Sequence, residues 1–130
     1  MMIPDGFHSV SPYIFSSNSR KLIEFLKSSF GAKEVLITED DQGRVSNAIV
    51  RIGDSSFMIS DGGGKVSPMP ASFMLYVENA DATVKLALQN GATQEMPVAD
   101  QPYGDRQGGI KDPTGNIWWV SQRLVTGPYT

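Results

Sequence analysis

The chain has 130 residues, a net charge of −3 and no cysteine. This length predicts one compact domain, and a hydrophobic content of 40% is enough for a core. The absence of cysteine excludes disulfides, thiolate catalysis and thiolate metal sites. No block of lysine or arginine suggests a nucleic-acid partner. No apolar stretch reaches the length of a membrane span and no signal-peptide pattern is visible, so we expect a cytoplasmic protein with no membrane partner.

The first half of the chain predicts a β-α-β-β-β order of elements. Residues 11–16 alternate weakly between apolar and polar and are expected to form a strand. Residues 17–19 offer helix caps, and the apolar residues that follow recur at spacings of three and four, so we predict an amphipathic helix that ends at Gly31. Three further strands are expected at residues 35–38, 45–52 and 57–60.

The same order returns after a linker at residues 62–70, which is rich in glycine and proline. The expected elements are a strand at 72–77, a helix between Asn79 and Gly91, a strand at 94–98 and a hairpin at 103–121. An offset of 60 residues places Tyr13-Ile14-Phe15 on Phe73-Met74-Leu75, which indicates an internal duplication. We therefore expect a single domain, residues 1–130, with modules at about 8–61 and 71–123.

The predicted hairpin contains the run YGDRQGGIKDPTGNIWWV. Pro113 suits the second position of a tight turn because its φ is fixed, and Gly115 can take the positive φ that the end of a turn often needs. Trp118 and Trp119 are adjacent on a strand, so their side chains point to opposite faces. We expect Trp118 to pack beneath a helix, whereas Trp119 either lines a cavity or fills the core.

This hairpin resembles the second-module hairpin of the vicinal oxygen chelate superfamily, in particular its PhnB-like branch. The matching positions are Tyr103-Gly104-Asp105-Arg106, Gly108, Asp112-Pro113, Gly115 and Trp118. The superfamily includes glyoxalase I, bleomycin-resistance proteins, fosfomycin-resistance enzymes and extradiol dioxygenases. The resemblance covers residues 8–123 and implies an α+β fold in which two βαβββ modules form a curved mixed sheet, with helices outside and a concave pocket. It does not imply one activity, because this fold hosts many chemistries.

The superfamily's metalloenzymes take their ligands from the first and last strands of each module. Counting from the glycines that end the helices and the hairpin turn places these positions at Ser11, Met58, Ser72 and Trp119, with Pro12 and Ser60 as the alternatives to the first two. Hydroxyl, thioether and indole groups are poor ligands for a catalytic divalent metal, which prefers imidazole and carboxylate. We therefore expect no metal and no other cofactor.

A large ring at Trp119 suits an aromatic ligand by stacking or a cation by cation–π contact. The resemblance to bleomycin-resistance proteins implies a metal-free homodimer that sequesters a small aromatic or cationic molecule in a concave or dimer-interface pocket. The ligand-binding candidates are Trp119, Ser11, Tyr13, Met58, Ser72, Tyr103 and Arg106. No hydroxyl has an adjacent base, so no catalytic residue is predicted.

Other interpretations remain open at this point. Any metal-dependent activity is uncertain, but a glyoxalase-like lyase or isomerase is the alternative, and its spare ligand candidates are Glu34, Glu39, Asp61, Glu95 and His8. The pocket could also be vestigial, with a dimer surface as the functional part. Tyr103 could equally anchor its loop. Asp105 and Arg106 are expected to form a local ion pair that holds a loop from Pro102 to Gly109, and His8 is expected on the surface.

Overall fold

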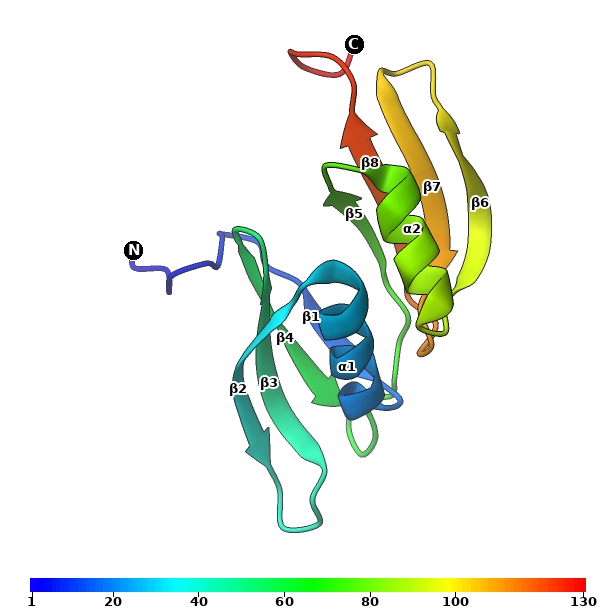
Figure 1. The fold of residues 1–130 in the computed structure, drawn as a ribbon. Helices are drawn as coiled ribbons and strands as arrows, with labels where there is room; N and C mark the ends of the chain where they lie inside the picture. Colours follow the sequence, from blue (N-terminus) through cyan, green and yellow to red (C-terminus); the bar gives the residue numbers. More distant parts are fainter. The chain divides into compact units, whose positions relative to one another are not determined.

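A computed structural model describes all residues from 1 to 130 and divides the chain into two units, residues 1–70 and 71–130 (Figure 1). The elements of the first unit are β1 (Tyr13–Ser16), α1 (Ser19–Phe30), β2 (Lys33–Glu39), β3 (Val45–Ile52) and β4 (Ser55–Asp61). Those of the second are β5 (Ser72–Tyr76), α2 (Ala80–Gln89), β6 (Thr93–Asp100), β7 (Asp105–Lys111) and β8 (Ile117–Arg123). The predicted α+β fold with two β-α-β-β-β modules is confirmed.

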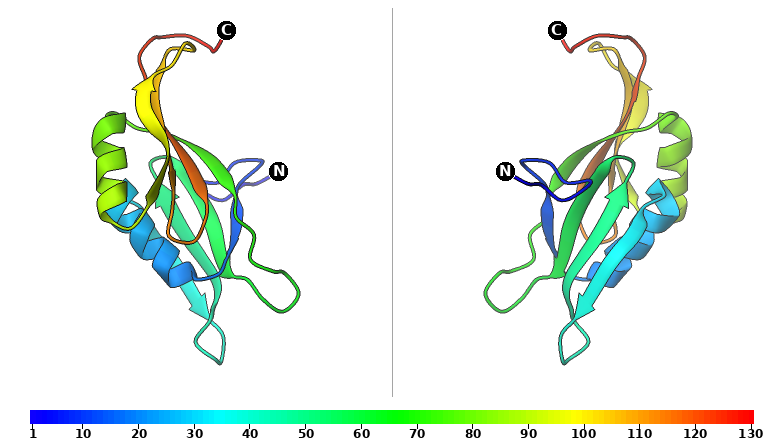
Figure 2. Two further views of the ribbon diagram at one scale, coloured as in Figure 1. Left: turned by 90° about the vertical axis from the view of Figure 1, so that its right-hand side faces the viewer. Right: turned by 90° about the vertical axis from the view of Figure 1, so that its left-hand side faces the viewer.

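Each unit has a four-stranded mixed sheet of its own. The strand orders are β1-β4-β3-β2 and β5-β8-β7-β6, and in both sheets the first pair is parallel while the others are antiparallel. Within each unit the helix lies against one face of the sheet (Figure 2). We call the other face, which has no helix of its own unit against it, the open face of that unit. Neither helix is long and apolar enough to cross a membrane.

The helix ends follow the sequence signals. Asn18 caps α1 through its side-chain oxygen, which accepts from Lys21 N at 3.1 Å, and Gly31 ends the helix in the left-handed region with φ 68°. Asn79 caps α2 in the same way, accepting from Ala82 N at 3.0 Å. These caps were expected because they join residues only a few positions apart.

The hairpin turn between β7 and β8 is built around the buried carboxylate of Asp112. One carboxylate oxygen accepts from Thr114 N at 2.8 Å, and the other accepts from Asn116 Nδ2 at 3.0 Å and Trp118 Nε1 at 2.8 Å. Gly115 N closes the turn on Asp112 O at 3.0 Å. The aspartate of this motif therefore has a structural role: it joins the turn to the indole that lies beneath α2.

The two tryptophans lie on opposite faces, as predicted. Trp118 is only 3% exposed and stacks on Phe73 with ring centroids 4.5 Å apart. Its face of the sheet also carries the fully buried Ile110 and Val120, and β7 and β8 contact α2. Trp119 lies on the open face and is partly exposed.

The first strand is shorter than predicted, because β1 begins at Tyr13 rather than at Ser11. The Ser11 hydroxyl accepts from His8 N and donates to His8 O, both at 2.9 Å, which closes a local turn. Pro12 has no N–H to give to a ladder, although its carbonyl accepts from Met58 N at 3.3 Å. The predicted linker at 62–70 contains no helix or named strand, and Met69 N donates to Phe15 O at 2.9 Å.

The duplication is real, but its strand alignment differs from the sequence offset by one residue. Asp61 and Gln122 each accept from the first N–H of the helix of their unit, so residues 61 positions apart are equivalent. Ile14 is therefore the counterpart of Leu75, whereas the sequence offset placed it on Met74. A shift of one residue moves a side chain to the opposite face of a sheet, so this correction decides which residues share the open faces.

Candidate ligand-binding site

The open face of the second unit carries a hydrogen-bonded pair at two of the positions expected for metal ligands. Trp119 Nε1 donates to Ser72 Oγ at 2.9 Å, and these residues lie on the adjacent strands β8 and β5. Gly109 on β7 lies directly opposite Trp119. A Cβ at Gly109 would lie 2.7 Å from Cζ3 of the indole, so the absence of a side chain lets the ring lie across the strand.

The open face of the first unit has a hydroxyl pair of its own at Tyr13 and Ser60. With the corrected alignment Tyr13 corresponds to Met74, and Ser60 corresponds to Ser121. The two hydroxyls lie 2.6 Å apart. Since Ser60 Oγ donates its one hydrogen to Ser46 O at 2.8 Å, the Tyr13 hydroxyl must be the donor to Ser60, and it accepts in turn from Asn47 Nδ2 at 3.2 Å. Counting from the sequence had placed the ligand positions of this unit at Ser11 and Met58, which the corrected alignment matches to Ser72 and Trp119.

The equivalent positions do not fit a catalytic divalent metal. Ser11, Met58, Ser72 and Trp119 offer two hydroxyls, a thioether and an indole N–H. The Ser11 hydroxyl is bonded to the backbone of His8, and the indole is bonded to Ser72. No group of three or more His, Cys, Asp or Glu side chains in the chain is placed to hold a metal ion.

Three of the spare acidic candidates are engaged in other contacts. Glu39 pairs with Arg20 at 2.9 Å and Glu95 with Lys111 at 3.4 Å. Asp61 accepts from the backbone N–H groups of Ser19 and Val45, both at 2.9 Å. Burial alone would raise the pKa of Asp61, but these hydrogen bonds and the nearby charge of Arg44 outweigh it and hold the pKa below its ordinary value.

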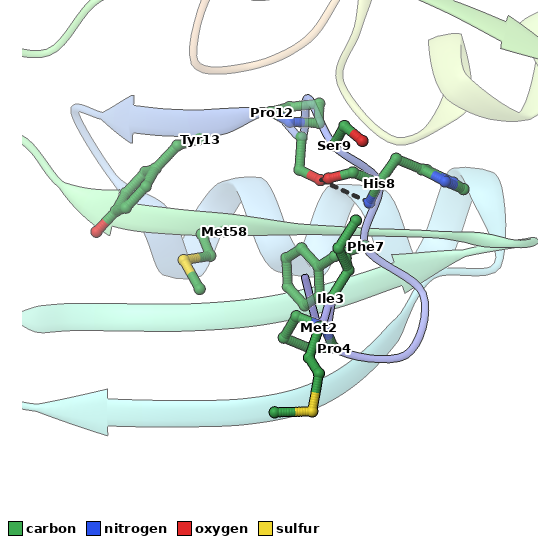
Figure 3. Close-up of a pocket in the computed structure, with 10 residues that line it drawn as sticks. Met2, Ile3, Pro4, Phe7, His8, Ser9, Pro12, Tyr13 and Met58 are labelled. Atoms are coloured by element: carbon green, nitrogen blue, oxygen red, sulfur yellow. Dashed lines mark hydrogen bonds between the residues drawn. The ribbon is translucent and has the colours of Figure 1, made fainter.

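A cavity of about 310 Å³ lies in the first unit, where the N-terminal segment packs beside β1 and β4 (Figure 3). Gly6 and Pro12 tie this segment to β4, because their carbonyls accept from Ser56 N at 2.8 Å and Met58 N at 3.3 Å. The wall is mostly apolar, with a few polar groups. The lining residues are Met2, Ile3, Pro4, Phe7, His8, Ser9, Ser11, Pro12, Tyr13 and Met58.

Side-chain directions divide this cavity into an apolar wall and a polar rim. In Figure 3 the Met58 side chain lies between Tyr13 and the ring of Phe7, and the imidazole of His8 points away from all three. His8 is exposed, as predicted. Tyr13 is 44% exposed, and its ring stacks on Phe15 at 4.6 Å with an interplanar angle of 5°. The cavity therefore offers a flat aromatic wall beside a thioether.

The predicted ion pair between Asp105 and Arg106 is wrong. These residues are neighbours on β7, not on a loop, so their side chains point to opposite faces. Arg106 lies on the helix side, where Nε and Nη2 contact both carboxylate oxygens of Asp81 at 2.6 and 3.0 Å, and Nη1 contacts Asp100 at 3.0 Å. The Asp81 hydrogen bond, followed by that of Asp100, raises the pKa of Arg106.

Asp105 is the centre of a polar network on the open face that the sequence did not reveal. Its fully buried carboxylate accepts from Ser121 Oγ at 2.6 Å, Arg123 Nη1 at 2.8 Å and the Tyr129 hydroxyl at 2.6 Å. Burial alone would raise its pKa, but the hydrogen bonds from Ser121, Tyr129 and Arg123 outweigh burial and lower the pKa. Asp105 is therefore an anionic acceptor held inside the unit.

Tyr103 joins the same network. Its hydroxyl donates to Gln107 Oε1, and Gln107 Nε2 contacts Ser121 Oγ and Met74 Sδ, both at 3.3 Å. Gln107 and Met74 lie on the open face that carries Trp119. In the sequence, only Asp105 in the hairpin motif could have pointed to this network, because the residues that bond to its carboxylate are distant from it in the chain.

The structure thus distributes the predicted site residues over two places and leaves one apart. Ser11, Tyr13 and Met58 line the cavity of the first unit. On the second unit, three others lie on the open face or at its end: Ser72, Trp119 and Tyr103. Arg106 alone lies on the helix side, in ion pairs.

Comparisons with known proteins agree with this architecture. The family described as "Glyoxalase/Bleomycin resistance protein/Dioxygenase superfamily" matches residues 6–120. An uncharacterized protein of Mycobacterium bovis is 30% identical, with 88% of this chain and 82% of that protein covered, and an uncharacterized protein of Mycobacterium tuberculosis strain H37Rv is also 30% identical, with 88% and 74% covered.

Solved structures share the fold at lower identity. TioX from Micromonospora sp. ML1 is 20% identical with a TM-score of 0.75, over 90% of this chain and 99% of that one. TnmS3, an antibiotic binding protein from Streptomyces sp. CB03234, is 20% identical with a TM-score of 0.69, over 89% and 98%. A PhnB protein from Bacillus cereus is 19% identical with a TM-score of 0.69, over 88% and 99%. From its sequence match and its fold, the chain belongs to the glyoxalase/bleomycin resistance protein/dioxygenase superfamily.

Proposed function

We propose that the protein is a metal-free binding protein that sequesters a small aromatic or cationic molecule. The observation that carries the proposal is the cavity of about 310 Å³ in the first unit, whose wall is mostly apolar and includes Tyr13 and Met58. Small-molecule sites are concave and mostly apolar, with a few polar groups that orient the ligand, and their volumes start near 300 Å³. The lining also includes the serines Ser9 and Ser11, whose hydroxyls are the polar groups of this kind.

Aromatic surfaces support an aromatic ligand in preference to an aliphatic one. Tyr13 presents one ring at the cavity, and the partly exposed Trp119 presents another on the open face of the second unit. Both rings are held by hydrogen bonds, from Tyr13 to Ser60 and from Trp119 to Ser72. A ring held in place loses little freedom on binding, so stacking or cation–π contact is obtained at low entropic cost.

The chemistry of the four equivalent positions supports binding without a metal, because none of Ser11, Met58, Ser72 and Trp119 carries imidazole or carboxylate. The metal-dependent lyase or isomerase would need such groups on one face. An antibiotic binding protein from Streptomyces sp. CB03234 shares this fold, which supports the proposed class of function and leaves the ligand of this chain to experiment.

A thermal-unfolding panel tests the proposal. It contains bleomycin, other planar aromatic compounds with and without a positive charge, and Ni²⁺ and Zn²⁺ salts. A ligand at about 100 times its Kd stabilises the folded state by about 2.7 kcal/mol. We expect stabilisation by at least one aromatic compound and none by the metals; stabilisation by stoichiometric metal alone would sink the proposal in favour of an enzyme.

The site is tested with matched methionine variants. Met58→Ala removes a cavity wall, and Met69→Ala removes a methionine that is 53% exposed and lies outside the cavity lining. We expect the affinity for the aromatic ligand to fall about tenfold in Met58→Ala and to stay unchanged in Met69→Ala. Equal affinities in both variants would show that the cavity is not the site.

We also propose that the protein is a homodimer, as the resemblance to bleomycin-resistance proteins implies. Sedimentation equilibrium with and without the aromatic ligand measures this directly. If the measured mass is that of one chain at all concentrations and the ligand still binds with full affinity, the proposed dimer is wrong. The cavity is then the binding site of a monomer.

A further inference from the structure

The segment after β8 turns back at the end of the second unit (Figure 1) and carries Tyr129 to the buried carboxylate of Asp105. The Tyr129 hydroxyl lies 2.6 Å from Asp105 Oδ2 and 2.7 Å from the Tyr76 hydroxyl. Because the carboxylate can only accept, Tyr129 donates its hydrogen to Asp105, and Tyr76 must donate to Tyr129. The phenol oxygen therefore acts as a donor and an acceptor at the same time.

The ring of Tyr129 is held as specifically as its hydroxyl. The guanidinium carbon of Arg123 lies 4.3 Å from the ring centroid, and the ring of Tyr103 meets it edge-on with centroids 6.2 Å apart. Arg123 Nη2 also donates to the carbonyls of Gly127 and Pro128, at 3.1 and 3.3 Å. The contacts to the hydroxyl and the contacts to the ring together recognise both parts of a phenol.

The occupant of this site is held less firmly than the site itself. Asp105 is fully buried, and Ser121 and Arg123 hold its carboxylate from β8. Residues 124–130 contain no helix or strand and are all exposed, and Tyr129 keeps 48% of its surface exposed. A segment with few buried contacts opens at low free-energy cost, so Tyr129 can leave a site that persists without it.

We propose that Asp105, Tyr76 and Arg123 form a binding subsite for a phenolic, hydroxyl-bearing aromatic ligand, which Tyr129 occupies in the absence of that ligand. The inference goes beyond the proposed function, because it uses none of the residues of the first-unit cavity. An ether could not donate to Asp105, and an ammonium could not accept from Tyr76. The guanidinium beside the ring also disfavours a cation there. The chemistry selects a neutral phenol.

Because Tyr129 occupies the subsite within the same chain, it competes with a free ligand and lowers the apparent affinity of that ligand. A group tethered by a short segment acts at an effective concentration on the order of millimolar, and the apparent affinity falls with the fraction of the site that remains free. Removing the Tyr129 side chain should therefore strengthen the binding of a free phenol about tenfold or more, although it removes contacts from the folded protein.

The test uses p-cresol, which is the tyrosine side chain as a free molecule, with toluene and 4-methylanisole as probes that lack the donor. Titrations of ¹⁵N-labelled full-length protein follow the side-chain amide of Gln107 and the Nε–H of Arg123. We expect p-cresol to bind Tyr129→Ala at least about tenfold more tightly than the parent, and toluene and 4-methylanisole to bind weakly to both. Thr130→Ala, a change in the same segment, should behave like the parent.

Two further variants, made in the Tyr129→Ala background, examine the phenol contacts. Asp105→Asn should weaken p-cresol about tenfold, and Tyr76→Phe, which leaves the buried ion pair intact, should weaken it about threefold and serves if Asp105→Asn does not fold. The inference is overturned if Tyr129→Ala and the parent bind p-cresol within twofold of each other, or if toluene binds as tightly as p-cresol. Signals from the Met58 methyl group report the first-unit cavity separately, so the two proposals can fail independently.

Discussion

The indole of Trp119 lies against the backbone of Gly109, where an added Cβ would come within 2.7 Å of Cζ3. Hydrogen bonding to Ser72 at 2.9 Å fixes the same ring from the neighbouring strand. One residue without a side chain and one hydroxyl thus set the position of the largest side chain on the open face of the second unit.

Gly109→Ala should displace the indole and destabilise the fold by about 1–3 kcal/mol, the usual cost of overpacking. Urea unfolding measures the cost, and near-ultraviolet circular dichroism reports the ring. The same substitution in a Trp119→Leu background should cost less than half as much, because the clashing atom is absent. An equal cost in both backgrounds would mean that the strand backbone, and not the indole, requires glycine.

Tyr13 and Ser60 should behave as one unit in the first module. Tyr13→Phe and Ser60→Ala each break the hydrogen-bonded chain from Asn47 to Ser46 O. A double-mutant cycle in urea should therefore show a coupling free energy of about 0.5–1.5 kcal/mol. Additive effects of the two substitutions would show that the 2.6 Å contact between the hydroxyls contributes nothing to stability.

Asp112→Ala should destabilise the protein by about 2–4 kcal/mol, because it leaves the buried N–H of Trp118 without its acceptor and removes the bonds that close the turn. Asp54→Ala is the matched control, since Asp54 is an exposed turn aspartate whose carboxylate accepts from the hydroxyl of the neighbouring Ser55. That control should change stability by less than about 0.5 kcal/mol. Similar costs at both positions would contradict the structural role of Asp112.

The contact of Tyr129 should depend on pH at the alkaline end. The hydrogen bond to Asp105, and then that from Tyr76, raises the pKa of Tyr129. Because the folded pKa lies above the ordinary value of about 10, the contact contributes stability that is fully present below about pH 10 and is lost as the pH rises through the raised pKa. Between pH 8 and 11 the stabilities of the parent and of Tyr129→Phe should converge above about pH 10, because only the parent loses the contribution of the contact. A constant difference in stability between the two proteins across this pH range would contradict the hydrogen bond between Tyr129 and Asp105.

Asp105 should act at the opposite end of the pH range. Its pKa is lowered in the folded state, so its network contributes stability that is present above the ordinary pKa of about 3.9 and is lost as the pH falls through the lowered value. Acid unfolding of Tyr129→Phe, which lacks one donor to this carboxylate, should begin at a higher pH than that of the parent. The same acid midpoint in both proteins would show that Ser121 and Arg123 alone maintain the charge.

The sequence by itself determined the elements and their order. Asn18 and Asn79 cap their helices, Gly31 ends the first one, and Asp112 to Gly115 form the hairpin turn, as expected from interactions between residues a few positions apart. Alternation on one strand also placed Trp118 and Trp119 on opposite faces, because this follows from the geometry of any strand.

Tertiary structure alone decided which side chains meet. The partnership of Tyr13 with Ser60 joins residues 47 positions apart and depends on how β1 and β4 pair, which no pattern within either strand indicates. The contact between Asp105 and Tyr129 joins residues that are 24 positions apart. Such contacts depend on how strands pair and how a segment folds back, and these are properties of the whole chain that no local pattern encodes.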